Sequence, residues 1–292
     1  MIPIVLLHHN QPDVLLQAVE HIKQHTIYPY RLFVVDNSSV VDLRVQEVLA
    51  RIELNYGVLV IKNAEDNWIY GFNLAMQHEA WVQSKYYAFS DADILVPEAK
   101  DGVCWLRYLI NQMDANCCIG KLGLSLDHAN LQANPALSKT LSIERGFLMG
   151  PKIGTNIVSP VDTTMALYRN DFFITDFRFR IGHASLARPY YFTCRTTPEI
   201  SAIHVGWDFY PGSGEGADSA DKRWKKALIF CFMGASVAPE LISDLKFHKR
   251  YFLEIMLRLI RIKHGVKVSY FMFIYLLKRF PRCINDIQAQ QR

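Results

Sequence analysis

Two carboxylates, Asp91 and Asp93, follow an apolar and aromatic run that begins at Tyr86. This run predicts a buried strand, and because side chains alternate along an extended chain, both carboxylates point to the same side. Two carboxylates aimed one way repel each other unless a cation or strong donors lie between them. Oxygen ligands at this spacing suit Mg²⁺ or Mn²⁺, which in turn suit a diphosphate. The alternative interpretation is a solvated turn or a helix N-cap, and the rest of the chain argues against it.

Polar side chains also follow two earlier segments that are predicted to be strands, at residues 2–9 and 31–35. A solvated loop would explain any one of them. The same pattern after three strands favours a shared ligand crevice, because ligands of open α/β sheets bind beyond the carboxyl ends of the strands. The acid after the second strand is placed to bond a ribose or the edge of a base. The polar residues of these two strand ends are His8, Asn10, Asp36 and Asn37.

Gly71 opens a further predicted helix, with Asn73 in its first turn. Glycine lets the backbone approach a ligand closely, and the amides at a helix N-terminus favour an anion. The sequence has no G-x-G-x-x-G after the first strand and no G-x-x-x-x-G-K-[ST] anywhere. These two absences argue against a dinucleotide site of the Rossmann type and against a P-loop.

The first hundred residues alternate strands with helices, which predicts a parallel sheet with right-handed crossovers. Beyond Pro97 the pattern predicts another helix, two more strands and a long loop with a short helix, of the kind that serves as a lid or binding loop. The predicted strands are residues 2–9, 31–35, 57–61, 86–97, 118–126 and 160–169; the helices are 12–22, 42–52, 101–114 and one that begins at 71; the long loop is 127–160.

Composition bounds the class of protein. Half of the 292 residues are hydrophobic and 21% are charged, so there is ample material for a core. The six cysteines form no C-x-x-C pair, which argues against a disulfide framework or a zinc site and favours a reducing compartment. The N-terminus is predicted to be a first strand rather than a signal peptide. No apolar run of about eighteen residues occurs, so no membrane-spanning helix is predicted.

The positive charge is concentrated at the C-terminus. Residues 240–292 hold eleven Lys and Arg against four Asp and Glu, a net of +7, whereas the whole chain carries +4. Two helical faces, residues 252–259 and 268–276, are apolar among these basic residues. Basic amphipathic helices with aromatic residues suit an anionic membrane surface. The alternative is a helical pair packed on the domain with a solvated basic face, and nucleic acid is not expected as a partner.

The ordered motifs resemble those of nucleotide-sugar glycosyltransferases of the GT-A fold, and glycosyltransferase family 2 in particular, over residues 2–207. The resemblance is carried by Val34-Val35-Asp36-Asn37-Ser38-Ser39, by Asn67 with Gly71-Phe72-Asn73-Leu74-Ala75, and by Ser90-Asp91-Ala92-Asp93. The segments Val161-Asp162-Thr163-Thr164-Met165-Ala166-Leu167-Tyr168-Arg169 and His204-Val205-Gly206-Trp207 look like those of bacterial enzymes that build surface polysaccharides.

The resemblance implies an α/β fold of the GT-A type, Rossmann-like, with a mostly parallel central sheet flanked by helices and a C-terminal basic helical appendage. We expect a glycosyltransferase domain at 1–238, with a nucleotide-binding half at 1–97 and an acceptor half at 98–238, followed by the tail at 239–292. It also implies roles for single residues: Asp36 at the uridine end of the donor, Asp91 at the ribose or the metal, and Asp93 and His204 at the metal. The nucleotide-sugar site would comprise His8, Asn10, Asp36, Asn37, Asn67, Gly71, Asn73 and Asp91.

Enzymes of this family invert the anomeric centre and need a carboxylate that deprotonates the acceptor hydroxyl. The usual E-D pair that supplies it is absent, and Asp162 is our first choice because it heads a strand in the acceptor half. As alternatives, Asp162 caps a turn and His204 is a core histidine. Other candidate bases are Glu144, Asp127 and Asp208; Trp207 either packs or stacks on a sugar, and Tyr168, Arg169 and Arg188 are candidates for binding acceptor or diphosphate.

The sequence therefore predicts a Mn²⁺- or Mg²⁺-dependent bacterial glycosyltransferase that acts at the cytoplasmic face of the membrane. It would move a sugar from a UDP-linked or other nucleotide-sugar donor to a growing glycan or lipid-linked acceptor, as in lipopolysaccharide or capsule synthesis. Inversion is expected, and retention is the alternative outcome. The rival functions are a catalytically silent binding or scaffold subunit of a polysaccharide-assembly complex and a sugar nucleotidyltransferase. The latter would need a glycine-rich phosphate loop after the first strand, which His8-His9-Asn10-Gln11 does not resemble.

Overall fold

The computed structural model describes residues 1–37, 39, 42–65, 71–75, 78, 84–161, 164–170, 192–206, 224, 227–228, 231, 237, 242–243 and 245–290. The chain divides into two compact units. The first comprises Met1–Tyr210 with Arg282–Arg292, and the second comprises Pro211–Pro281.

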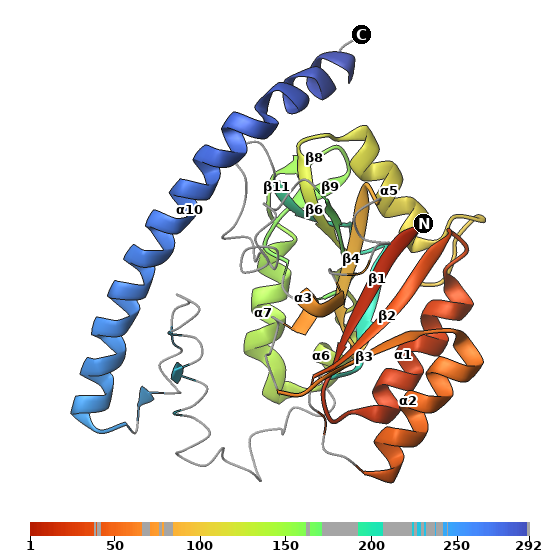
Figure 1. Ribbon diagram of the computed structural model, residues 1–292, viewed down its shortest axis with the longest axis horizontal. Helices are drawn as coiled ribbons and strands as arrows, with labels where there is room; N and C mark the ends of the chain where they lie inside the picture. Colours follow the sequence, from red (N-terminus) through yellow and green to blue (C-terminus); the bar gives the residue numbers. More distant parts are fainter. Residues whose placement is uncertain are drawn as a thin grey trace. The chain divides into compact units, whose positions relative to one another are not determined.

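The first unit is built on a large mixed sheet (Figure 1). Within the described residues its strand order is β3-β2-β1-β4-β10-β6-β11-β9-β8. The four strands of the N-terminal half pair in parallel, and β10 then runs antiparallel between β4 and β6. The strands are β1 (Ile2–His8), β2 (Tyr30–Asn37), β3 (Leu59–Asn63), β4 (Tyr86–Asp91), β6 (Ile119–Gly123), β8 (Lys152–Ile153), β9 (Asn156–Val158), β10 (Ala166–Arg169) and β11 (Phe192–Arg195).

Helices cover both faces of this sheet, as Figure 1 shows. On one face lie α1 (Pro12–His25), α2 (Leu43–Tyr56) and α5 (Trp105–Ala115), whose apolar sides form the main core with alternate residues of the strands. On the other face lie the short α3 (Phe72–Ala75) and α7 (Ser138–Phe147). The expectation of an α/β fold with a central sheet between helices is confirmed.

Local chemistry sets several element ends. Asp42 caps α2, because its side chain accepts a hydrogen bond from the backbone N–H of Val45 at 2.7 Å. Gly57 ends the same helix in the left-handed conformation, with φ of 60°. The predicted strand at 57–61 therefore begins too early, since Gly57 belongs to the helix cap and β3 starts at Leu59.

The stretch predicted as a long loop at 127–160 contains several short elements. They are α6 (Ala129–Ala133), η2 (Pro135–Leu137), α7, β8 and β9. Helix α7 does not bury a regular apolar face, which explains its weak periodicity in the sequence. Ile143 is 49% exposed, and the most buried described side chain of the helix is the acid Glu144. The predicted strand at 118–126 is also split, into β6 and β7 (Ser125–Leu126).

A second, small sheet has the order β5-β12-β7, with β5 at Ile94–Leu95 and β12 at Ser201–His204. Strand β12 pairs antiparallel with β5, so that His204 lies opposite Ile94. The backbone N–H of Val205 donates to the carbonyl of Asp93 at 3.0 Å. This pairing brings residues from distant parts of the sequence to the end of β4.

The basic C-terminal segment folds as a helix, α10 (Phe247–Gln290), which is the long helix in Figure 1 and belongs to the second unit up to Pro281. The structure therefore has one continuous helix across the two apolar faces identified in the sequence. Leu253 and Ile260 of this helix form a small core with Ala227 and Cys231. No helix in the described residues is long and apolar enough to cross a membrane.

Candidate active site

The carboxyl ends of β1, β2 and β4 meet at one edge of the large sheet. The strand register places His8 beside Asp36 and Leu7 beside Asp91. A pocket of about 250 Å³ opens at this edge. Its lining includes the predicted site residues His8, Asn37, Asp91 and Asp93, together with His9, Gln11 and the apolar Leu7 and Ala92.

Asp36 is held by a buried network. His8 Nδ1 lies 2.8 Å from Asp36 Oδ1, and the Ser39 hydroxyl donates to the same oxygen at 2.5 Å. The other ring nitrogen, His8 Nε2, accepts the backbone N–H of Gln11 at 3.1 Å. An acceptor nitrogen carries no proton, so the ring proton of neutral His8 is on Nδ1 and is donated to Asp36.

The network also sets the charge of Asp36. Burial by itself would raise the pKa of this carboxyl, but the hydrogen bonds from His8 and Ser39 outweigh burial and the pKa lies below the ordinary value of 3.8. Asp36 is therefore an ionised acceptor at neutral pH. Among the described residues, both side chains that bond Asp36 contact the same oxygen, Oδ1.

The lowered pKa of Asp36 predicts a defined pH dependence of stability. A carboxyl whose pKa is lower in the folded state stabilises the fold above its unfolded value, and the stabilisation is lost as the pH falls through the folded value. We expect wild type to exceed Asp36→Asn in free energy of unfolding by a constant amount from neutral pH down to about pH 5, because the ordinary pKa of an aspartate is 3.8 and the carboxyl stays ionised in both states above it. Below 3.8 the difference should shrink, as urea unfolding at each pH will show. A difference that grew with acidity would contradict the assigned hydrogen bonds.

His9 belongs to the same edge, although the sequence analysis did not select it. Its Nδ1 donates to the backbone carbonyl of Asn37 at 2.9 Å, and its Nε2 lies 2.8 Å from Asn10 Nδ2. Asn10 has a φ of 56°, a backbone conformation in which asparagine is enriched among side-chain-bearing residues. His9 therefore links the ends of β1 and β2. The only hint of this in the sequence is its position next to His8 at a strand end.

Gly71 lies against the floor of the pocket. A Cβ atom at this position would be 2.9 Å from Leu7 Cδ1 and 3.0 Å from Asn37 Oδ1. Asn37 Oδ1 in turn accepts a hydrogen bond from Asn63 Nδ2 at 2.9 Å. The close approach expected of Gly71 is thus an approach to Asn37 and Leu7, and α3, which follows it, is only four residues long.

Asp93 and His204 form the second half of the site. Asp93 Oδ2 is 3.8 Å from His204 Nδ1, and the two side chains are 18% and 15% exposed. Asp93 Oδ1 is buried and has no hydrogen-bond partner among the described residues. Burial raises the pKa of Asp93, and the neighbouring His204 opposes this shift only in part. A buried carboxylate oxygen without a hydrogen-bond partner in the described part of the chain has the chemistry of a cation ligand.

Several of the other predicted residues are not described by the structure. Asp162, Asn67, Trp207, Asp208 and Arg188 lie outside the described residues, and of Asn73 only its place in α3 is described. Asp127 lies just before the N-cap of α6, and its Oδ1 accepts the N–H of Ala129 at 2.7 Å.

Tyr168 and Arg169 pack inside the first unit. Tyr168 is buried and stacks on Tyr87 with ring centroids 5.2 Å apart. The guanidinium of Arg169 donates to the backbone carbonyls of Ile119, at 2.8 Å, and of Met113. Arg169 pairs with Tyr86, at the opposite end of β4 from Asp91, so its place in the fold is structural.

Among the described residues no group of three or more His, Cys, Asp or Glu side chains is arranged to hold a metal ion. This does not argue against Mg²⁺ or Mn²⁺ at Asp93. Magnesium is commonly bound through one or two carboxylates, with substrate phosphates and water supplying the remaining ligands. The oxygen of Asp93 and the adjacent nitrogen of His204 fit such a partial site.

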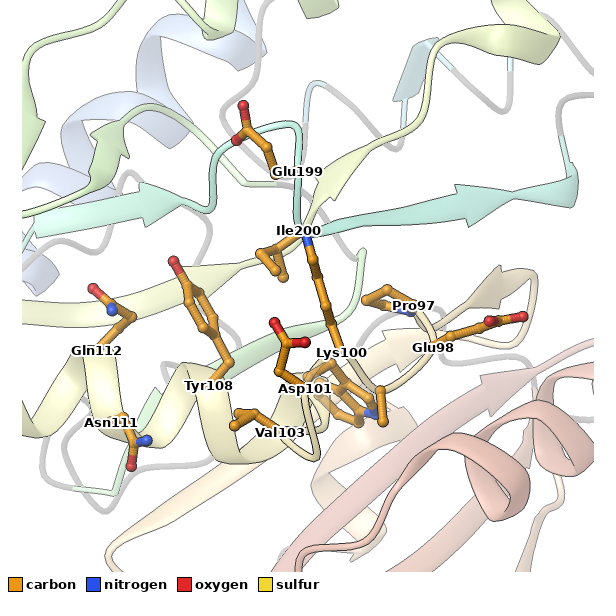
Figure 2. Close-up of a pocket in the computed structure, with 12 residues that line it drawn as sticks. Pro97, Glu98, Lys100, Asp101, Val103, Tyr108, Asn111, Gln112, Glu199 and Ile200 are labelled. Atoms are coloured by element: carbon orange, nitrogen blue, oxygen red, sulfur yellow. The ribbon is translucent and has the colours of Figure 1, made fainter.

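A larger groove, of about 730 Å³, lies elsewhere in the first unit (Figure 2). It is bounded by residues 97–103, by the exposed side of α5 and by Glu199 and Ile200 ahead of β12. One wall is a tight turn in which Asp101 and Gly102 both have positive φ, and Lys100 and Val103 pair across it. The groove shares no lining residue with the smaller pocket. Side-chain chemistry rather than size therefore locates the candidate active site.

Comparison with known sequences assigns the chain to a family. The model of the family described as "Glycosyl transferase family 2" matches residues 4–175, which is more than half of the chain. The chain belongs to glycosyl transferase family 2. The match includes the edge of the sheet that carries His8, Asp36, Asp91 and Asp93. A search of curated proteins finds no match.

Solved structures share the fold of this glycosyltransferase. PcManGT, a mannosyltransferase from Pyrobaculum calidifontis in complex with GDP-Man and Mn²⁺, has a TM-score of 0.50 at 14% identity, over 99% of this chain and 84% of its own. GalNAc-T7 with UDP, GalNAc and Mn²⁺ has a TM-score of 0.52 at 13% identity, over 86% of this chain and 53% of its own. TarS residues 1–349 from S. aureus in complex with UDP has a TM-score of 0.50 at 11% identity, over 86% of this chain and 77% of its own. At these identities the likeness shows the fold.

Proposed function

We propose that this glycosyltransferase takes its sugar from a nucleoside diphosphate donor bound in the pocket at the ends of β1, β2 and β4. The observation that carries the proposal is the side-chain arrangement there. An ionised Asp36, bonded to the pocket residue His8, suits a nucleoside, and a buried Asp93 beside His204 suits a metal ion on a diphosphate. UDP is the first donor to test, because an acceptor carboxylate after the second strand suits the uridine end.

We assign the Asp91-Ala92-Asp93 segment as the D-x-D motif of this enzyme. Asp91 would contact the ribose or the metal, while Asp93 and His204 would hold a divalent ion, Mn²⁺ or Mg²⁺, against the diphosphate. Such an ion offsets the negative charge that grows on the leaving diphosphate. The complexes of PcManGT and GalNAc-T7, which contain Mn²⁺ with a nucleotide, support the choice of metal.

The chain's own residues would position the donor before transfer. The His8 ring and the Ser39 hydroxyl hold Asp36 through Oδ1, and the ionised carboxylate would accept a hydrogen bond from the donor. His9 and Asn37 line the same pocket, and Asn67, Gly71, Asn73 and Asn10 complete the proposed nucleotide-sugar site. Asp162 is the proposed base that takes the proton from the acceptor hydroxyl, and the reaction inverts the anomeric centre.

The acceptor is proposed to be a growing glycan or a lipid-linked saccharide in the synthesis of a bacterial surface polysaccharide, such as lipopolysaccharide or capsule. Support comes from the resemblance of the segments at 161–169 and 204–207 to enzymes of that kind. A lipid-linked acceptor is presented at the inner face of the membrane. Peripheral attachment at that face, through the basic helix α10, is therefore part of the proposal.

Calorimetry with UDP tests the donor site. Wild-type protein should bind UDP in the presence of Mn²⁺, and binding should weaken strongly when EDTA removes the metal. Asp93→Asn should lose the metal-dependent part, whereas the matched control Asp101→Asn, in the larger groove, should bind as wild type does. If UDP, GDP and CMP all fail to bind with Mn²⁺ present, the assignment of this pocket as the donor site is wrong.

A change at Gly206 should disturb the metal site without removing a carboxylate. A Cβ at this position would be 1.9 Å from Asp93 Oδ2 and 2.8 Å from His204 Cε1, so Gly206→Ala must push the two side chains aside. Displacing groups that orient metal ligands costs about 10- to 100-fold in affinity, and we expect a loss of Mn²⁺-dependent UDP binding in this range. Calorimetry is the measurement.

Gly146→Ala is the control for Gly206→Ala. No atom lies within 4 Å of a Cβ at Gly146, which is inside α7. Alanine is favoured over glycine in a helix by about 1 kcal/mol, so this control should be slightly more stable and bind UDP as wild type does. Unchanged affinity in Gly206→Ala would contradict the assignment of Asp93 and His204 to the metal.

A further inference from the structure

Helix α10 carries an exposed apolar stripe along about 30 Å of its length, at a rise of 1.5 Å per residue. The stripe consists of Tyr251, Ile255, Leu259, Ile262, Val266 and Tyr270. These residues recur every three or four positions, so they share one face of the helix. Each is between 41% and 68% exposed. A contiguous apolar surface of this kind marks a place where something binds.

The stripe is not the face by which α10 packs within its own unit. Leu253 and Ile260 are buried, at 4% and 7% exposure, in the core that they form with Ala227 and Cys231. By the helical repeat of 3.6 residues per turn, Leu253 and Ile260 point away from the stripe. The helix is therefore apolar on two faces, and among the described residues the core of its unit is built on the face of Leu253 and Ile260.

Basic side chains border the stripe. By the same helical repeat, Arg258 lies along one edge and Lys263 along the other, and both are exposed. Between residues 246 and 282 the sequence has ten Lys and Arg and a single acid, Glu254. Long basic side chains can lay their apolar stems on a hydrophobic surface while their charged ends reach phosphate groups.

We propose that α10 lies in the surface of an anionic lipid bilayer, with the stripe toward the acyl chains and Arg258 and Lys263 at the level of the lipid phosphates. This inference deepens the peripheral attachment proposed above and rests on it. An interfacial helix buries its apolar face about 5–10 Å into the boundary between headgroups and acyl chains. Tyr251 and Tyr270, near the two ends of the stripe, are residues that favour this boundary.

The charge of the helix favours lipid over a second copy of the chain. Two copies that paired through this stripe would bring their basic borders together, and Glu254 is the one acid between residues 246 and 282 that could offset them. Like charges at close range repel, whereas an anionic surface attracts each basic residue. An anionic lipid bilayer thus matches the stripe in hydrophobicity and its basic borders in charge.

Vesicle flotation with the full-length protein tests the proposal. Wild type should float with vesicles of phosphatidylglycerol and phosphatidylcholine, and much less with phosphatidylcholine alone or at high salt. Leu259→Gln/Ile262→Gln should lose at least about 10-fold in binding, because the burial of two large apolar side chains is lost. Arg258→Gln/Lys263→Gln should lose roughly 5-fold for each charge, about 25-fold in all. Leu54→Gln, which changes an 84% exposed leucine on α2, is the matched control and should bind as wild type does.

Two further readouts separate the outcomes. Calorimetry with UDP and Mn²⁺ on the same variants should match wild type, which shows that the fold is retained and keeps the test independent of the donor site. Failure of wild type to bind anionic vesicles, or equal binding by Leu259→Gln/Ile262→Gln, overturns the proposal. So does a wild-type dimer in light scattering that this variant converts to a monomer without any vesicle binding, because the stripe would then be a protein interface.

Discussion

Asp93→Asn is expected to abolish sugar transfer while leaving the protein at least as stable as wild type. The loss of activity follows from the proposed role of Asp93 at the metal and diphosphate, where removing one charge-stabilising group costs about 100- to 1,000-fold in rate. The gain in stability has a different cause. Asp93 Oδ1 is buried with no hydrogen-bond partner among the described residues, and burial raises the pKa of the carboxyl.

A raised pKa means that the folded protein disfavours the ionised form. At neutral pH the charge on Asp93 therefore opposes folding, and His204 at 3.8 Å relieves this only in part. Asparagine keeps the shape of the side chain and removes the charge. We expect the variant to unfold at a urea concentration at least as high as wild type, because asparagine carries no charge to bury.

Two measurements on one preparation check this expectation: transfer or donor hydrolysis with Mn²⁺, and the midpoint of urea unfolding without metal. Asp101→Asn is the control, since Asp101 is exposed and lies in the larger groove. It should leave activity unchanged. An Asp93→Asn protein that kept its activity would refute the metal assignment, and one that lost more than about 2 kcal/mol would show that Asp93 holds the fold, as broken buried pairs do.

Glu144→Gln is expected to be the most destabilising of the substitutions considered, at about 3–5 kcal/mol. Arg195 Nη1 lies 2.6 Å from Glu144 Oε2, and the two side chains are 3% and 11% exposed. The same guanidinium donates through Nε to the carbonyl of Pro160 at 2.6 Å and lies 4.6 Å from the centroid of the Phe147 ring. Glutamine keeps the shape of the acid but leaves the charge of Arg195 buried without a counter-ion.

Urea unfolding measures this loss, with Asp13→Asn as the control. Asp13 pairs with Arg44 at the surface, where both side chains are at least half exposed, so the control should change stability little. Replacing both buried partners, in Glu144→Gln/Arg195→Met, should recover part of the loss, because a buried charge no longer remains. A loss below about 1 kcal/mol in the single variant would mean that the pair is hydrated.

The same variant bears on the identity of the catalytic base. The sequence analysis included Glu144 among the candidate bases. A catalytic base must have a carboxylate oxygen available to take the proton of the acceptor hydroxyl. In the structure Glu144 is engaged by Arg195. We therefore expect Glu144→Gln to lower stability and not the rate of the protein that remains folded.

Strand patterning and motif order were enough to predict the α/β fold, the family and half of the residues that line the pocket. These features are local. A buried strand that ends in Asp91 and Asp93, or a helix with Pro12 at its start and Ile22 on its inner face, can be predicted because period and capping act within a few residues. The same reasoning failed at Gly57. The sequence pattern placed this glycine at the start of a strand, whereas in the structure it caps the end of α2.

Such local patterns could not predict contacts between residues that are far apart in the sequence. Ser39 meets His8 from 31 positions away, and Arg195 meets Glu144 from 51. Gly206 lies against Asp93 because β12 pairs with β5. A glycine that follows a strand does not by itself predict this pairing. Nor can periodicity tell which apolar face of a helix is packed: both faces of α10 have helical spacing, and only the fold buries Leu253 and leaves Leu259 in water. Spacing along the chain sets which side chains share a face, but burial depends on what the rest of the chain brings against it.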